Sequence, residues 1–329
     1  MVFFTLFAEL SAFLLFLGVL FYLWFMRKDH KSIAQIVSGS LFGVTLEFMN
    51  VQVMHTYTYS PEFLIQLGSP PDNIPICIGL CWGLIIYACM NVSNKVVNIP
   101  EWSRSVLDGF LALTIDLSMD TIAIRLDGGF WSWIDIPMEP FPTLNSFFGV
   151  NYGNFVGWFF VVLIFSVMLR LEEKEISKKF NVPSILSILY FLIIPFFSYL
   201  PLFLSFHVLP LPVYILFNIL SIYNYSIPSG LTGLSILIYT MILASIILLV
   251  PFSQSKPIVE KNTDLLPPII FIFFHLSYFG FYFLGGLFSK TPLILLLGIL
   301  MFIIDGFINF MTLDMEKLSI IIKDFMNIQ

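Results

Sequence analysis

The sequence predicts an all-α fold, a polytopic transmembrane helical bundle of about eight to ten spans. Its 329 residues are 58% hydrophobic and only 11% charged, with a mean hydropathy of +0.94. A soluble domain is typically about 25% charged. Apolar stretches of roughly 20 residues, the length that crosses a bilayer, recur along the chain. The formal net charge of −6 provides no basic surface for nucleic acid, so we expect the lipid membrane as the partner and no nucleic acid.

The first five spans follow from hydropathy and from the placement of basic residues. Residues 2–26 form the first span, and they lack the basic start and small-residue cleavage site of a signal peptide. The next spans are expected at residues 32–54, 74–90, 103–124 and 154–169. The connections that this topology places inside hold nine basic residues, against Arg125 alone outside: Arg27, Lys28, Lys31, Lys95, Arg104, Arg170, Lys174, Lys178 and Lys179. By the positive-inside rule, the N-terminus is then outside the cell membrane, which we expect to be bacterial or archaeal.

The remaining spans are less regular. Residues 183–206 and 208–223 are apolar, but their prolines could kink them or make a re-entrant pair. Three more spans are expected at residues 230–252, 267–288 and 292–312. If the proline-rich pair crosses the membrane only once, these three reverse their direction. We therefore divide the chain into residues 1–180, with five spans and the acidic residues, and residues 181–329, with helices of undefined role.

Within residues 107–133, Asp108, Asp116 and Asp120 lie in an otherwise apolar run. A carboxylate at membrane depth costs roughly 2.5–3.5 kcal/mol, so such acids usually face the bundle interior and have a function. Asp116 and Asp120 are one helical turn apart on one face. Two carboxyl groups so close and away from water cannot easily both ionise, so one should hold a proton near neutral pH. Asp108 is near the inner end of its span, where we expect it to be solvated.

A fourth acid, Glu47, continues a stripe with Gly39 and Gly43 at four-residue steps. Small residues at this spacing let a neighbouring helix approach closely, which turns Glu47 toward the bundle. The topology brings Glu47 and the acid pair to the outer halves of their spans, near Asn154. We expect them to share one outer pocket with residues of the adjoining loops and span: Tyr57, Tyr59, Trp131, Trp133 and Trp158.

Each group has a structural alternative. The paired acids could join helices, the aromatic residues could form a belt at the lipid headgroups, and Asn154 could cap its helix. Cys77, Cys81 and Cys89 lie in one apolar segment and are expected to pack, without forming a disulfide framework or zinc site. Asp305 and Asn309 share a face of the last span, and His275 begins an aromatic stripe; we expect packing to be their main role.

Six motifs occur in the order and with the gaps of the carotenoid biosynthesis protein family, which the segment from about residue 41 to residue 171 resembles. They read GVTLEFMNVQ (43–52), HTYTYS (55–60), IPICIGLCW (74–82), TIDLSMD (114–120), GFWSW (129–133) and FFGVNYGNFVGW (147–158). The family includes membrane carotenoid 1′,2′-hydratases of the bisanhydrobacterioruberin hydratase type. The resemblance implies a catalytic role for Glu47, Asp116 and Asp120, and substrate contacts for Tyr57, Tyr59, Trp131, Trp133, Asn154 and Trp158.

The implied reaction is the acid-catalysed addition of water to the terminal double bond of an acyclic carotenoid, with no cofactor and no metal. The implied partners are a polyene substrate from the bilayer and other enzymes of the carotenoid pathway. A membrane prenyltransferase is an alternative, because Asp-x-x-x-Asp also occurs where Mg²⁺ holds a diphosphate, although only Arg125 is near for the phosphates. A proton-coupled transporter with buried acids as a relay is a further alternative.

Overall fold

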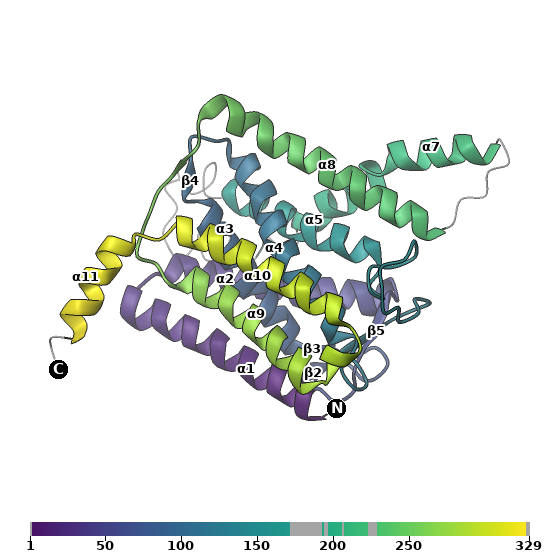
Figure 1. Ribbon diagram of the computed structural model, residues 1–329, viewed down its shortest axis with the longest axis horizontal. Helices are drawn as coiled ribbons and strands as arrows, with labels where there is room; N and C mark the ends of the chain where they lie inside the picture. The colour runs from purple at the N-terminus through teal and green to yellow at the C-terminus, as the bar shows by residue number, and fades with distance from the viewer. Residues whose placement is uncertain (1, 172–192, 194–196, 206, 223–228, 327–329) are drawn as a thin grey trace.

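The computed structural model is a helical bundle, and it describes residues 2–171, 193, 197–205, 207–222 and 229–326 (Figure 1). Within these ranges, seven helices are long and apolar enough to cross a membrane. The predicted class, a polytopic membrane bundle, is therefore confirmed. Lys174, Lys178, Lys179 and most of the expected span 183–206 lie outside the described residues.

The N-terminal helices fall at the positions that the sequence predicts, but the acid-bearing helix of residues 101–123 is not among the seven apolar ones. Two of them end in a π-helical turn. The helices are α1 (Val2–Phe21) with η1 (Tyr22–Arg27), α2 (His30–Phe48) with η2 (Met49–Val53), α3 (Ile76–Ser93), α4 (Glu101–Ala123) and α5 (Tyr152–Leu171).

In the C-terminal part, three long helices pack onto this group, and α11 projects from the bundle at the left of Figure 1. Residues 197–205 are also helical. The elements are α7 (Leu211–Ile222), α8 (Ser229–Ser255), α9 (Leu266–Leu284), the short η4 (Leu287–Ser289), α10 (Pro292–Met311) and α11 (Met315–Met326).

Helix α4 lies at the centre, in contact with α3, α5, α8, α9 and α10. Because neighbours surround it, polar side chains on different faces of α4 can all avoid lipid. Asp108 and Asp116 are fully buried, and Asp120 is 2% exposed. Protein therefore encloses all three aspartates of the helix.

Glycines bring α2 and α3 into close contact. A Cβ atom on Gly39 would lie 3.0 Å from the Cα atom of Gly83, and one on Gly83 would lie 2.4 Å from the carbonyl oxygen of Ile36. The expected close approach along the Gly39 and Gly43 stripe is confirmed, and Glu47 on the same face is buried. The two backbones are close enough for a side chain of α3 to reach the end of α2.

Short antiparallel strand pairs join the loops at both ends of the bundle. One end, which we call the site end, holds β1 (Tyr57–Tyr59) paired with β5 (Trp131–Trp133) and β2 (Gln66–Leu67) paired with β3 (Ile74–Pro75). The other, which we call the basic end, holds β4 (Val96–Val97) paired with β6 (Ile258–Val259). The sequence did not predict these strands, because two or three residues carry no readable periodicity.

Contacts at the basic end fix the direction of the last three long helices. Asp264, just before α9, accepts a 2.7 Å hydrogen bond from Arg27 at the end of η1. Near the start of α8, a Cβ atom on Gly233 would lie 3.5 Å from Cβ of Tyr152, at the site end. Helix α8 thus runs from the site end to the basic end, so the chain between α5 and α8 makes one net crossing. Helices α8, α9 and α10 therefore run in the reversed direction, which was one of the two directions that the sequence left open.

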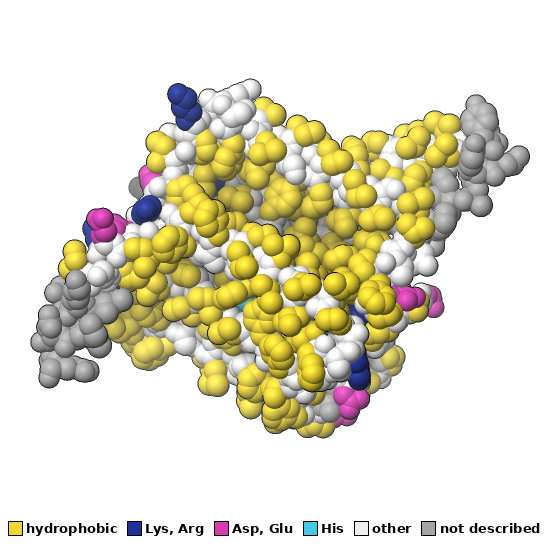
Figure 2. Space-filling model, viewed as in Figure 1, with side chains coloured by type: hydrophobic (Ala, Val, Ile, Leu, Met, Phe, Trp, Pro, Cys, Tyr) yellow, Lys and Arg dark blue, Asp and Glu magenta, His cyan; other side chains and the backbone are white. Residues whose placement is uncertain are grey.

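The visible surface suits a lipid environment. Hydrophobic side chains cover most of the face in Figure 2, and the charged ones lie toward the two edges where helices end. Leu14 on α1, Leu249 on α8 and Phe307 on α10 are among the exposed large apolar side chains. This distribution is that of a bundle whose flanks contact acyl chains.

Candidate functional site

A cavity of about 1140 Å³ opens within the site end of the bundle. Its walls come from α1 to α5, α9, the β1–β5 pair, residues 199–203 and His207, and most lining side chains are apolar. Every predicted site residue except Asp116 lines it: Glu47, Tyr57, Tyr59, Asp120, Trp131, Trp133, Asn154 and Trp158. The tertiary structure thus gathers residues from five separate elements around one space.

Glu47, near the end of α2, is 3% exposed and is surrounded by hydrogen-bond donors. The Tyr59 hydroxyl donates to its Oε2 atom at 2.7 Å, and the Tyr57 hydroxyl donates to the same oxygen. Its Oε1 atom accepts from the indole Nε1 of Trp82 at 2.9 Å. Three donors on one buried carboxylate compensate much of the cost of removing it from water.

The paired acids of α4 meet Asn154 of α5. The side-chain nitrogen of Asn154 lies 3.0 Å from Asp116 Oδ1 and 2.7 Å from Asp120 Oδ2. The alternative role of Asn154 as a helix cap is wrong, because the side chain of Asn151 instead accepts from the Gly153 backbone N–H at 2.8 Å. One amide group therefore holds both carboxyl groups in place.

The two acids differ in their relation to the cavity. Asp116 accepts from Asn154 on both oxygens and does not line the cavity. Asp120 lines it, and its buried Oδ1 atom has no hydrogen-bond partner within the described part of the chain. Asp120 is thus the member of the pair with a free oxygen next to the space for a ligand.

The aromatic motifs form a cross-strand ladder. Tyr57 pairs with Trp133, and Tyr59 pairs with Trp131, with ring centroids 5.0 Å and 6.0 Å apart. Alternate residues of a strand face the same side, which explains the Tyr-x-Tyr and Trp-x-Trp patterns. Tyr57, Tyr59 and Trp131 are buried and Trp133 is half-buried, so they line the cavity and do not form a belt at the headgroups.

Comparison with known families agrees with this arrangement. Residues 8–223 match the family described as carotenoid biosynthesis protein. This chain belongs to the carotenoid biosynthesis protein family. No curated protein and no solved structure matches the chain in the corresponding searches. The predicted family is confirmed, and the matched region contains all the predicted site residues of this carotenoid biosynthesis protein.

One residue of the site was not singled out from the sequence. Trp82 of the carotenoid biosynthesis protein lines the cavity, donates a hydrogen bond to Glu47 and lies against Trp158 with ring centroids 4.2 Å apart. It ends the motif IPICIGLCW, which was a signal that a residue there could be functional. Its contact partner on α2 could not be read from the sequence.

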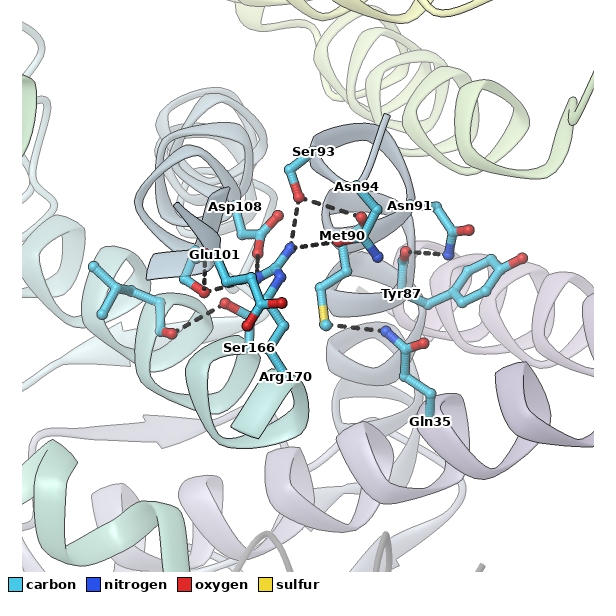
Figure 3. Close-up of polar contacts among 12 residues, drawn as sticks. Gln35, Tyr87, Met90, Asn91, Ser93, Asn94, Glu101, Asp108, Ser166 and Arg170 are labelled. Carbon is cyan, nitrogen blue, oxygen red and sulfur yellow. Dashed lines mark hydrogen bonds and ion pairs between the residues drawn. The ribbon is translucent and has the colours of Figure 1, made fainter. Parts of the chain in front are cut away.

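The expectation that Asp108 is solvated is wrong. Asp108 is fully buried, and its Oδ2 atom lies 2.5 Å from Nη1 of Arg170 on α5 (Figure 3). Arg170 also donates to Ser105 at 2.7 Å and Ser93 at 2.8 Å. Asp108 avoids water because α5 returns to the same end of the bundle and brings a buried guanidinium to it.

Asp305 belongs to a third polar group, outside the cavity and beyond the matched region. Its Oδ2 atom lies 2.7 Å from Nε2 of His275, and Thr114 of α4 donates to it at 2.8 Å. Nearby, the Tyr278 hydroxyl of α9 donates to the carbonyl of Ile294 on α10 at 2.8 Å. These contacts tie α9 and α10 to α4, consistent with the expected packing role.

The residues available for metal binding are few. In the described ranges, no three His, Cys, Asp or Glu side chains are placed to share a metal ion. Cys77, Cys81 and Cys89 are free thiols on α3, of which Cys77 and Cys89 are buried.

Proposed function

We propose that this carotenoid biosynthesis protein adds water across the terminal isopropylidene double bond of an acyclic carotenoid. The observation that carries the proposal is the presence of Asp120 and Glu47, from α4 and α2, in one largely apolar cavity. An unactivated alkene needs a proton donor and a proton acceptor near the same carbons, without bulk water.

Asp120 is the proposed proton donor. Its buried Oδ1 atom lacks a partner among the described residues, and the neighbouring Asp116 disfavours a second negative charge. In the proposed step the Asp120 O–H bond breaks, and the proton bonds to the less substituted carbon of the double bond. The other carbon becomes a tertiary carbocation.

The aromatic ladder supports this step. Faces of aromatic rings attract a cation within about 6 Å of the ring centroid. Trp131, Trp133 and the two tyrosines of β1 provide such faces on the cavity wall. They would lower the energy of the carbocation and of the transition state that resembles it.

Glu47 is the proposed proton acceptor. Water bonds to the carbocation and releases a proton to Glu47, which leaves a tertiary alcohol. Return of that proton to Asp120 restores the enzyme, so the cycle consumes one alkene and one water and needs no cofactor. The donors on Glu47 offset part of the cost of burying its charge.

Expression in a host that produces an acyclic carotenoid tests the proposal. Extraction and mass analysis should show a pigment heavier by one water with the wild-type chain. Asp120→Asn should reduce this product about 100- to 10,000-fold, the usual contribution of a general acid. Asp127→Asn, at an exposed loop position, is the matched control and should hydrate normally. An unchanged pigment with the wild-type chain would exclude hydration of that carotenoid.

A further inference from the structure

We infer that Trp82 is the positioning residue of the site: it holds Glu47 in place as the proton acceptor, and Gly43 makes this possible. The inference rests on the proposed hydration and assigns roles to two residues that have none in it.

The indole N–H of Trp82 donates a hydrogen bond to one particular oxygen of Glu47. An indole N–H can donate but cannot accept, so its partner must be an acceptor. Trp82 Nε1 lies 2.9 Å from Glu47 Oε1, while both tyrosine hydroxyls donate to Oε2. Among the residues that the structure describes, Trp82 is therefore the donor that fixes the Oε1 side of the carboxylate and sets the rotation of the group.

Gly43 gives the indole its place. Gly43 and Glu47 lie on one face of α2, one turn apart. A Cβ atom on Gly43 would lie 2.5 Å from Cβ and 2.7 Å from Cδ1 of Trp82. The ring thus crosses α2 at the level of Gly43, and its N–H reaches Glu47 on the next turn. No other residue type leaves room for this arrangement.

The indole also contacts a residue of α5. Trp158 lies against it with ring centroids 4.2 Å apart and an interplanar angle of 36°. Trp82 itself is 5% exposed. Packed against both Gly43 and Trp158, the ring has little freedom to rotate. Preorganised groups of this kind lower the cost of reaching the transition state.

Trp82→Phe removes the N–H and keeps an aromatic ring in the space. We expect kcat for hydration to fall about 10- to 100-fold, the value of a hydrogen bond to a charged group, with KM changed less than about threefold. Because the lost bond favoured ionised Glu47, the acidic limb of the pH–rate profile should move to higher pH. A residue with a purely structural role would change the amount of folded protein but not this profile.

Gly43→Ala tests the same contact from the other helix, since it keeps the indole N–H but forces the ring to move. It should reproduce the lower kcat and the shifted profile. Gly39→Ala is the matched control: its Cβ atom would meet Gly83 at 3.0 Å, so it disturbs the same helix contact without meeting Trp82. It should leave kcat per folded molecule within about twofold.

The outcomes are distinct. If the wild-type chain hydrates and Trp82→Phe keeps wild-type kcat and pH profile, the role of Trp82 is refuted and the proposed function stands. Equal losses in Gly43→Ala and Gly39→Ala would also refute it, because general helix packing would then explain the effect. If the wild-type chain forms no hydrated pigment, the proposed function itself fails.

Discussion

The side-chain nitrogen of Asn154 lies 2.7 Å from Asp120 Oδ2, and the same nitrogen reaches Asp116. This contact joins α5 to α4 at the level of the cavity. It orients both the acid that lines the cavity and the acid that does not. The position of Asp120 therefore depends on a residue from another helix.

Asn154→Ala should lower hydration about 10- to 100-fold, because the two carboxyl groups lose the donor that holds them. Product formation per folded molecule, measured by mass analysis of extracted pigment, is the readout. Asn91→Ala is the control. Asn91 donates to the Tyr87 carbonyl at 2.9 Å near the basic end, at the opposite end of the bundle from Asp116 and Asp120. Hydration by Asn154→Ala at the wild-type rate would show that the acids orient themselves without Asn154.

The tyrosines of β1 should make the protein sensitive to alkaline pH. Burial, and then the charge of Glu47, raise the pKa of Tyr57 and of Tyr59 well above the usual value of 10.0. The folded state therefore keeps these protons at a pH where the unfolded chain releases them. The free energy of unfolding should be unaffected below about pH 10 by these groups and should fall as the pH rises above it.

Thermal unfolding in detergent between pH 7 and pH 11 measures this effect. Tyr57→Phe and Tyr59→Phe should each make the alkaline fall in Tm shallower, because one titrating group is removed. An alkaline slope identical to that of the wild-type chain in both variants would contradict the explanation.

The buried ion pair at the basic end should contribute to stability and not to chemistry. Arg170→Met leaves Asp108 charged and unpaired in the interior (Figure 3), which typically costs about 3–5 kcal/mol of unfolding free energy. The double variant Asp108→Leu with Arg170→Met should recover much of the loss, since no unpaired charge remains. Tm in detergent reports both effects, and hydration per folded molecule should stay close to wild type. A loss of activity without a loss of stability would place the pair in the reaction.

The topology predicts which loops share a side of the membrane. Lys28 and Lys261 lie at the basic end, and Glu62 and Lys290 lie at the site end, all exposed. Single cysteine substitutions at these positions should label with an impermeant maleimide as two pairs. By the positive-inside rule, Lys28→Cys and Lys261→Cys should react only after the cells are opened. Labelling of Lys28→Cys and Lys261→Cys from opposite sides would refute the single net crossing between α5 and α8.

Much of the fold was predictable because a membrane imposes simple rules on sequence. Long apolar runs had to be helices, since a bilayer leaves no other partner for their backbone groups. The Gly39 and Gly43 stripe predicted a close helix contact for the same local reason. The prolines from residue 183 onward did not determine how often residues 183–223 cross the membrane, because a proline can kink, end or interrupt a helix.

The prediction for Asp108 was wrong because it used only the position of this residue within its own span. Near the end of its span it resembled a solvated acid. Its burial depends on Arg170, 62 positions later, which only the packing of α5 against α4 brings close. Trp82 was overlooked for a similar reason: nothing in α3 alone indicates that its N–H meets Glu47.

The sequence by itself determined that this chain is a helical membrane protein, which family it resembles and that Glu47, Asp116 and Asp120 lie inside the bundle. Those features follow from hydropathy, helical spacing and the cost of a charge in lipid, all of which act along one segment. Only the tertiary structure decided that Asp120 and not Asp116 lines the cavity, that Trp82 bonds to Glu47, and that α8 to α10 run in the reversed direction. These depend on contacts between segments far apart in the chain, which close packing selects and no single segment specifies.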